Sequence, residues 1–354
     1  MLFDPLELRS LKLKNRIVVS PMCQYSSEDG FASDWHLVHL GSRAVGGAAV
    51  VFTEATAVTP EGRISPQDLG LWKDQHMPEL ARIARFVKAQ GAVPGMQLAH
   101  AGRKASTQRP WDGNAQLTEA QGGFRPIYAP SALAFRPDKE EAPTALDAAG
   151  LARVVRAFGE AAARAVEAGF ETLELHAAHG YLLHEFLSPL ANQRTDSYGG
   201  SFQNRTRLVL ESVRAIRQKL PERLPLFVRI SATDWADGGW NLEESIELSK
   251  LLSKEGVDLV DCSSGGLVPT AKIPVGPGFQ TPFAERIRRD AGVKTGAVGV
   301  IRDAVQAEHI VRTGQADVVI IAREFLRQPY FPLLAAKALG EKIAWPPQYD
   351  RARE

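Results

Sequence analysis

Eight short apolar, β-branched runs alternate along the chain with longer amphipathic stretches, and this alternation restricts the fold more than any other feature. A continuous apolar run is typical of a strand that is covered on both faces, as in a parallel sheet. The predicted strands are residues 17–19, 49–53, 93–98, 172–175, 226–230, 259–262, 293–296 and 318–321. The predicted helices are residues 35–45, 77–90, 146–168, 202–220, 242–255, 282–290, 303–313 and 324–339.

Eight strand–helix units predict an α/β protein with a (β/α)₈ TIM barrel, which typically takes about 250 residues. A doubly wound open sheet is the alternative, and it needs a glycine-rich turn after its first strand. Here the first strand is followed by Ser20-Pro21-Met22-Cys23, which is no such turn.

One segment, residues 101–144, does not fit the repeat. It is rich in Pro, Gly and aromatic residues and is too long for a simple loop. We expect an inserted lid or small subdomain at the barrel mouth, between strand 3 and helix 3. No linker divides the chain, so residues 1–354 are predicted to form one domain.

Composition excludes several classes of function. Lys and Arg number 42 against 41 Asp and Glu, whereas a nucleic-acid binder needs a basic surface. No apolar run approaches the ~18 residues of a membrane span, and the N-terminus has no signal-peptide pattern. The two cysteines, Cys23 and Cys262, can form neither a disulfide framework nor a four-cysteine metal site. We therefore expect a cytoplasmic protein without nucleic-acid or membrane partners.

Polar residues follow nearly every predicted strand. The C-terminal ends of the strands carry the active site in (β/α)₈ barrels, so this pattern predicts a site there. The residues at these strand ends are Ser20, Cys23, Tyr25, Glu54, Gln97, His100, Glu174, His176, His179, Tyr181, Arg229, Ser263 and Arg323, together with the small residues Ala57, Gly265, Gly266, Gly299 and Ala322.

The pair His176 and His179 allows three interpretations. The two rings could be metal ligands, with Glu174, Asp234 or His100 as the third. They could be hydrogen-bonded histidines packed under a loop. They could also donate hydrogen bonds to a substrate oxygen and stabilise charge that develops there. The spacing alone leaves all three open.

Two further side chains are informative. Cys23 is either a small apolar core residue or part of the site, and a nucleophile would need an activating base that the sequence does not reveal. Arg229 lies inside a predicted strand, where a guanidinium needs an anionic or acceptor partner, and none is evident nearby in the sequence. The glycine-rich ends of strands seven and eight suit phosphate binding by backbone N–H groups.

Four motifs together resemble the Old Yellow Enzyme family of flavin-dependent ene-reductases, and most closely its thermophilic-like branch with the xenobiotic reductases. The motifs are Pro21-Met22-Cys23-Gln24-Tyr25, residues 97–104 (QLAHAGRK), residues 176–181 (HAAHGY) and residues 192–201 (NQRTDSYGGS). The resemblance covers essentially the whole chain. It implies a barrel that holds one non-covalent FMN, with NADPH or NADH as hydride donor.

The resemblance also implies residue roles. The residues at the flavin would be Ser20, Pro21, Met22, Cys23, Ala57, Gln97, Arg229, Ser263, Gly265, Gly266, Gly299, Ala322 and Arg323. Arg229 would lie beside N1 and the C2 carbonyl, where a fixed cation stabilises the reduced ring. His176 and His179 would bind the electron-withdrawing group of the substrate, Tyr25 would line the pocket, and Tyr181 would be the proton donor.

The implied reaction is the NAD(P)H-dependent reduction of activated C=C bonds in α,β-unsaturated carbonyl compounds, nitroalkenes and maleimides. FMN N5 would deliver hydride to the β-carbon and Tyr181 a proton to the α-carbon. Both substrates would use one site, which implies ping-pong kinetics.

The family further implies a homodimer or homotetramer with shared active sites. Residues 341–354 would lie at the subunit interface, and Arg351 would reach the neighbour's substrate pocket. An extended tail would put Tyr349 and Arg351 on one side. One departure is Ala322, where branch members usually have glycine.

The sequence also bears on three rival functions. Multidomain relatives carry a cysteine cluster for iron–sulfur, which two cysteines do not supply. A metal-dependent barrel hydrolase would bind no flavin. A non-enzymatic flavin-binding protein would have no use for His176, His179 and Tyr181.

Overall fold

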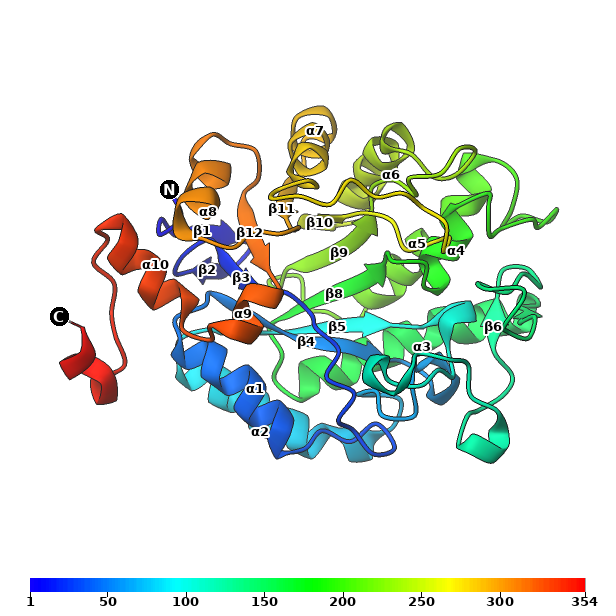
Figure 1. Ribbon diagram of the computed structural model, residues 1–354, viewed down its shortest axis with the longest axis horizontal. Helices are drawn as coiled ribbons and strands as arrows, with labels where there is room; N and C mark the ends of the chain where they lie inside the picture. The colour runs from blue at the N-terminus through cyan, green and yellow to red at the C-terminus, as the bar shows by residue number, and fades with distance from the viewer. Residues whose placement is uncertain (354) are drawn as a thin grey trace.

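All eight predicted strands are present in the computed structural model, which describes residues 1–353. Their order, β10-β11-β12-β3-β4-β5-β8-β9, closes a barrel, and every neighbouring pair in it is parallel (Figure 1). The strands are β3 (Ile17–Val19), β4 (Val50–Ala57), β5 (Val93–Ala99), β8 (Thr172–Ala177), β9 (Leu226–Ser231), β10 (Leu259–Ser263), β11 (Lys294–Ala297) and β12 (Val318–Ile321). The prediction of a (β/α)₈ barrel is confirmed.

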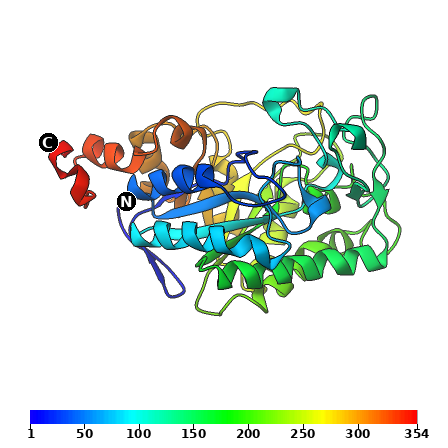
Figure 2. The same cartoon turned by 90° about the horizontal axis from the view of Figure 1, so that it is seen from below.

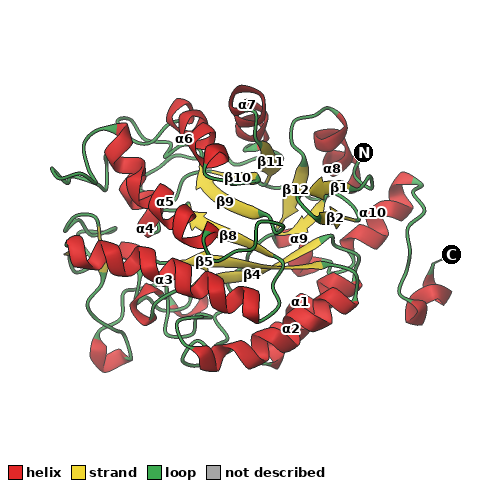
Figure 3. Cartoon of the chain, turned by 180° about the vertical axis from the view of Figure 1, so that it is seen from behind, coloured by secondary structure: helices red, strands yellow, loops and turns green. Residues whose placement is uncertain are grey.

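Helices surround the barrel on all sides (Figure 3). The outer helices are α1 (Asp34–Val45), α2 (Met77–Ala89), α3 (Ala148–Glu167), α5 (Phe202–Arg217), α6 (Leu242–Lys254), α7 (Thr281–Ala291), α8 (Ala304–Arg312) and α10 (Phe331–Leu339). Two short helices, α4 (Leu182–Leu187) and α9 (Arg323–Arg327), lie beyond the ends of β8 and β12.

The predicted helix 324–339 is wrong as a single element, because it is divided into α9 and α10 at Gln328-Pro329. Proline has no N–H to donate, and its ring disfavours a helical conformation in the residue before it. Gln328 accordingly has φ −132° and ψ 85°.

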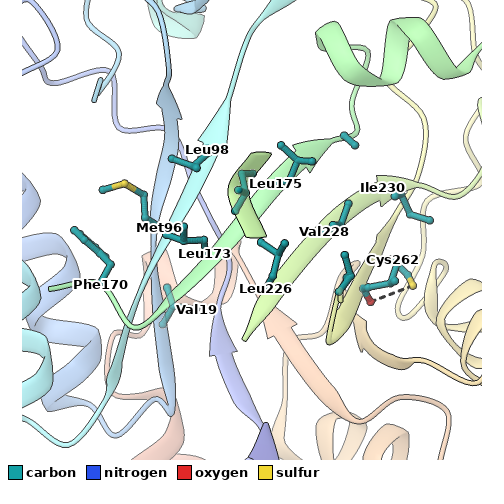
Figure 4. Packing of buried hydrophobic residues seen from close by; sticks show 14 of the residues in the cluster. Val19, Met96, Leu98, Phe170, Leu173, Leu175, Leu226, Val228, Ile230 and Cys262 are labelled. Atoms are coloured by element: carbon teal, nitrogen blue, oxygen red, sulfur yellow. Dashed lines mark hydrogen bonds between the residues drawn. The ribbon is translucent and has the colours of Figure 1, made fainter. Parts of the chain in front are cut away.

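Alternate strand residues face opposite sides of the barrel wall. Val19 and Leu98 point outward into the layer between strands and helices, with Leu175 and Val228 beside them (Figure 4). The inward cluster contains Phe52 and Phe227, whose rings lie 5.5 Å apart. Burial of such side chains contributes roughly 1.5–3 kcal/mol each to folding.

An N-terminal hairpin that the sequence did not reveal covers one end of the barrel. Strands β1 (Leu6–Leu8) and β2 (Leu11–Leu13) pair antiparallel. Their side chains Leu6, Leu8 and Leu13 are buried in the same cluster as Phe52 and Phe227. The N-terminal end of the barrel is therefore filled with apolar side chains.

Residues 101–144 lie at the opposite end, beyond the C-terminal ends of the strands (Figures 1 and 2). They contain three short 3₁₀ turns and the two-residue strands β6 (Tyr128–Ala129) and β7 (Thr144–Ala145), which pair with each other. We call the end of the barrel beside this insertion the mouth.

Residues 341–353 project from the body of the molecule at the end remote from the insertion (Figure 2). Pro347–Ala352 form a 3₁₀ helix, so the expected extended tail is wrong. With about three residues per turn, Tyr349 and Arg351 do not lie on one side. The Tyr349 ring packs against Tyr330 at 5.8 Å. Within residues 1–353, no helix has both the length and the apolar character needed to cross a membrane.

Candidate active site

A charged layer crosses the barrel interior between the apolar cluster and the mouth. Arg229 of β9 donates from Nε to Asp261 Oδ2 at 2.5 Å, and the two residues are register partners on adjacent strands. The Arg229 Nε atom also lies 3.6 Å from Glu174 Oε1, which accepts a hydrogen bond from Gln97 Nε2 at 2.7 Å. Asp261 is the partner of Arg229 that sequence reasoning missed. The available signal was a carboxylate inside an otherwise apolar strand.

The Arg229 guanidinium also faces a cavity of about 300 Å³ at the mouth. Its Nη2 atom donates to Ser20 Oγ at 2.9 Å, which holds the guanidinium against the loop after β3. Of the predicted flavin residues, the cavity is lined by Ser20, Pro21, Arg229, Ser263, Gly299, Ala322 and Arg323. Met22, Cys23, Ala57, Gln97, Gly265 and Gly266 do not line it. The lining residues that the sequence did not single out include Phe279, Gln280, Val298 and Arg302.

One end of this cavity is cationic. In the described chain, the side chains of Arg302 and Arg323 have no ion pair or hydrogen bond, whereas Arg327 is paired with Glu324 at 2.9 Å. Unpaired guanidinium groups next to backbone N–H groups are a suitable environment for a phosphate. This end of the cavity therefore fits the phosphate of FMN.

The backbone at this end is shaped for close approach. Gly299 has φ +126°, and a Cβ there would lie 2.9 Å from Gln280 Nε2, so only glycine fits without strain. Ala322, by contrast, has φ −105°. Its φ is negative, so this position does not require the left-handed conformation that favours glycine.

The turn after β8 brings together His176, His179 and Tyr181. The ring centroids of the two histidines lie 5.1 Å apart, and those of His176 and Tyr181 lie 5.0 Å apart. His176 Nδ1 accepts a hydrogen bond from the Ala178 N–H at 3.3 Å, which leaves the proton on Nε2. His179 Nε2 contacts Ser263 Oγ at 2.7 Å.

Both imidazoles are neutral at physiological pH. Burial lowers the pKa of His176 and of His179 well below its usual value, and the positive charge of Arg229 lowers both further. A neutral imidazole carries one N–H, so each ring can donate one hydrogen bond to a substrate oxygen.

The geometry of this turn depends on a close backbone contact. Gly180 has φ +71°, and a Cβ there would lie 2.2 Å from the carbonyl oxygen of Gly266. Lys104 Nζ donates to the carbonyl of His179 at 2.7 Å and also to that of Gly266. Gly266 thus supports the histidine turn. Lys104, a residue of the 97–104 motif without an assigned role, ties the two loops together.

Cys23 and Tyr25 lie in the loop after β3, which Glu54 holds in place. Glu54 Oε2 accepts from the Gln24 N–H at 2.9 Å, and its Oε1 lies 3.2 Å from His36 Nε2. Burial raises the pKa of Cys23 well above its usual value, and the nearby carboxylates raise it further. The thiol is therefore protonated, and the environment does not support a nucleophilic thiolate. Cys262 is buried in the strand layer.

The three candidate third metal ligands have other partners. His184 Nε2 lies 2.8 Å from Asp234 Oδ1. His100 Nδ1 accepts from the Gly102 N–H at 3.1 Å, and Glu174 belongs to the charged layer. Among residues 1–353, no group of three or more His, Cys, Asp or Glu residues is arranged to hold a metal ion.

The protein is a closed (β/α)₈ barrel in which a cationic cavity lies next to two neutral histidines and a tyrosine. This arrangement fits the class of cofactor-dependent barrel oxidoreductases. Residues 1–341 match the NADH:flavin oxidoreductase / NADH oxidase family. The NADPH dehydrogenase of Halalkalibacterium halodurans is 48% identical over 353 residues, which cover 99% of this chain and 98% of the relative.

Solved structures agree with this likeness. Morphinone reductase superposes with a TM-score of 0.79 at 27% identity and covers 98% of this chain and 92% of its own. A 2-naphthoyl-CoA reductase has the same fold, with a TM-score of 0.85 at 24% identity, over 96% of this chain and 52% of its own. The chain belongs to the Old Yellow Enzyme family of NADH:flavin oxidoreductases and is an FMN-dependent NADPH dehydrogenase.

Proposed function

We propose that the enzyme reduces C=C bonds conjugated to a carbonyl or nitro group, including α,β-unsaturated carbonyl compounds, nitroalkenes and maleimides. The observation that carries this proposal is the cluster of His176, His179 and Tyr181 next to the flavin cavity. Reduction of such a bond adds one hydride and one proton, and bound FMN supplies the hydride.

The two histidines bind the substrate's oxygen. Each neutral ring donates one N–H bond, and these bonds strengthen as negative charge moves onto the oxygen during hydride addition. Ser263 orients the His179 ring and the Ala178 N–H orients the His176 ring. The site thus stabilises the enolate-like charge that develops on the substrate oxygen.

Tyr181 supplies the proton to the α-carbon. Burial raises the pKa of its phenol well above the usual value, and the carboxylate of Asp68 acts in the same direction. The hydroxyl therefore stays protonated until the substrate carbanion develops next to it. General acid catalysis of this kind typically contributes ~10²–10⁴-fold to the rate.

The insertion at residues 101–144 acts as a lid over this pocket in our proposal. Its first residues contact the loops of the mouth, where Arg103 Nη2 donates to the Leu267 carbonyl at 2.7 Å. Trp111 is 62% exposed, and its ring lies edge-on to Tyr25 at 5.7 Å. An aromatic wall of this kind suits planar conjugated substrates.

The active sites are shared between subunits of a homodimer or homotetramer in the same proposal. Residues 341–353 project away from the mouth of their own barrel (Figure 2), and Arg351 is exposed. On α1, Trp35 is 57% and Val38 is 67% exposed, an apolar surface that a second subunit can cover. Arg351 then completes the substrate pocket of the neighbouring subunit.

Anaerobic half-reactions test the substrate class. The FMN-loaded enzyme is first bleached with one equivalent of NADPH, and an enone, a nitroalkene or a maleimide is then added. We expect the oxidised flavin spectrum to return with formation of one equivalent of the saturated product. A reduced enzyme that reoxidises with oxygen but with none of these alkenes would contradict the proposal.

A further inference from the structure

The charged layer below the flavin cavity contains one more acidic group than its single cation can neutralise. Glu174 and Asp261 have no exposed surface, Gln97 is 1% exposed and Arg229 is 4% exposed. Two ionised carboxylates beside one guanidinium would leave a net negative charge on side chains that have no exposed surface. Such an uncompensated charge is strongly unfavourable in a low-dielectric interior.

The hydrogen bonds of the layer leave two acceptor atoms unsatisfied. Asp261 Oδ2 accepts from Arg229 and Glu174 Oε1 accepts from Gln97, but Asp261 Oδ1 and Glu174 Oε2 have no donor. Both carboxyl groups lie beside the same Arg229 Nε atom, which is 2.5 Å from Asp261 Oδ2 and 3.6 Å from Glu174 Oε1. Ionised carboxylates can only accept hydrogen bonds, so a proton on one of the two groups would supply the donor that this layer lacks.

We propose that Glu174 and Asp261 hold a single proton between them, as positioning residues that keep the layer neutral and make the reduction potential of the bound flavin depend on that proton. Burial raises the pKa of Glu174 to about 8, and it also raises that of Asp261, although Arg229 opposes both shifts. The paired carboxyl groups thus titrate as one unit. The inference depends only on flavin binding and not on the identity of the alkene.

The other groups around Arg229 do not take this role. Ser20 is an uncharged acceptor from Arg229 Nη2, and the Cys23 thiol is protonated. The imidazoles of His176 and His179 are neutral. Lys104, whose pKa burial lowers to about 8, contacts the carbonyls of His179 and Gly266 and not Arg229. Among the groups in contact with Arg229, the carboxyl pair is therefore the one whose charge can change between neutral and alkaline pH.

A coupling to the flavin follows from electrostatics. Electrons that arrive in the cavity bring negative charge close to Arg229 and the pair, and added negative charge raises the affinity of nearby acids for protons. At a pH below the pKa of the carboxyl pair, the pair holds its proton in both redox states of the flavin. At a pH above that pKa, reduction of the flavin is accompanied by the uptake of one additional proton by the pair, so the midpoint potential falls more steeply with pH.

The variant Glu174→Gln tests this inference in the FMN-loaded enzyme. A glutamine keeps an oxygen for Gln97 and supplies an N–H to Asp261, so it imitates the protonated glutamate with a hydrogen that does not titrate. We expect the variant to bind FMN and to lose the steeper alkaline part of the potential-against-pH curve. Isotope-edited infrared spectra should also lose a protonated-carboxyl C=O band at neutral pH.

Glu185→Gln is the matched control, because Glu185 is also fully buried, with a pKa raised by burial to about 8, but contacts Arg103 instead of Arg229. It should keep the alkaline break in the potential. A Glu174→Gln enzyme with the wild-type break and the wild-type infrared band overturns the inference. If Glu174→Gln does not fold, the same two measurements are made on Asp261→Asn. The infrared spectrum of the wild-type enzyme is an independent test, because the absence of any protonated-carboxyl band there also overturns the inference.

Discussion

The hydroxyl of Ser263, at the end of β10, lies 2.7 Å from Nε2 of His179, in the turn after β8. Two strand ends that are far apart in sequence thus set the orientation of one imidazole. The contact leaves Nδ1 of His179 as the ring atom available for a substrate.

Ser263→Ala should weaken binding of the alkene. A typical hydrogen bond contributes about 0.5–1.5 kcal/mol, so we expect KM for the alkene to rise roughly 2–10-fold. Ser264→Ala is the control, because Ser264 Oγ instead donates to Gln280 Oε1 at 2.6 Å. Steady-state kinetics with a saturating hydride donor measure both variants, and an unchanged KM in Ser263→Ala would show that the contact does not orient the ring.

Tyr181→Phe should separate the two half-reactions. The substitution keeps the ring and removes the O–H, so alkene reduction should slow by ~10²–10⁴-fold while flavin reduction by NADPH stays nearly unchanged. Tyr198→Phe removes a hydroxyl that bonds Glu211 at 3.0 Å, and it should leave both rates unchanged. Stopped-flow absorbance follows each step, and equal losses in both steps would sink the assignment of Tyr181.

Arg323→Met should distinguish FMN from riboflavin. If this guanidinium binds the phosphate, its loss removes a charge-assisted bond of about 1.5–3 kcal/mol, which corresponds to roughly 10–150-fold in Kd for FMN. Riboflavin has no phosphate, so its affinity should be unaltered. Fluorescence titration of the apoprotein measures both, and parallel losses for the two flavins would place Arg323 elsewhere.

The alkene half-reaction should show no break near pH 6.5. Burial holds the pKa of His176 and His179 well below that value, so both rings stay neutral as the pH falls from about 8 to about 5.5. Pre-reduced enzyme mixed with alkene across this range tests the expectation. An apparent pKa near that of free histidine would mean that one ring is charged in the working enzyme.

The same lowered pKa values predict how stability changes with pH. In the unfolded chain these histidines bind a proton near pH 6.5, whereas in the folded chain they do not. At acidic pH the unfolded state therefore binds more protons than the folded state. The free energy of unfolding is highest above pH 6.5 and decreases as the pH falls below that value. Thermal unfolding should show Tm decreasing in that direction, and less so in a His179→Asn variant.

Mixed oligomers test the shared site. Chains with Tyr181→Phe are co-expressed with chains carrying Arg351→Ala, and the mixed species is isolated by two affinity tags. If Arg351 acts in the neighbouring subunit, the Arg351→Ala chain keeps its own Tyr181 and receives an intact arginine, so one complete site returns. Mixed oligomers no more active than the two parents would refute the shared site.

Much of the fold follows from local pattern. The strand cores are continuous apolar runs, and each was predicted within a few residues of its bounds. The hairpin β1–β2 was missed because two three-residue strands are too short for a periodic signal. The helix break at Pro329 was missed although proline marks it, because the apolar pattern continues on both sides.

The site was less predictable because its contacts are long-range. The family motifs contain His176, His179 and Tyr181, and these three side chains meet in one turn. Asp261 lies 32 positions from Arg229 and meets it only because β9 and β10 pair in register. The 3₁₀ tail likewise packs its Tyr349 ring against Tyr330, a contact between separate elements that the local sequence does not encode.

The hairpin that fills the N-terminal end of the barrel also bears on how substrates reach the site. Because Leu6, Leu8 and Leu13 are buried in the same cluster as the inward phenylalanines, the N-terminal end of the barrel is closed. In the proposed mechanism, the hydride donor and the hydride acceptor therefore both reach the flavin from the mouth, and each excludes the other while it is bound. Inhibition by an excess of either reactant is the expected consequence of this shared entrance.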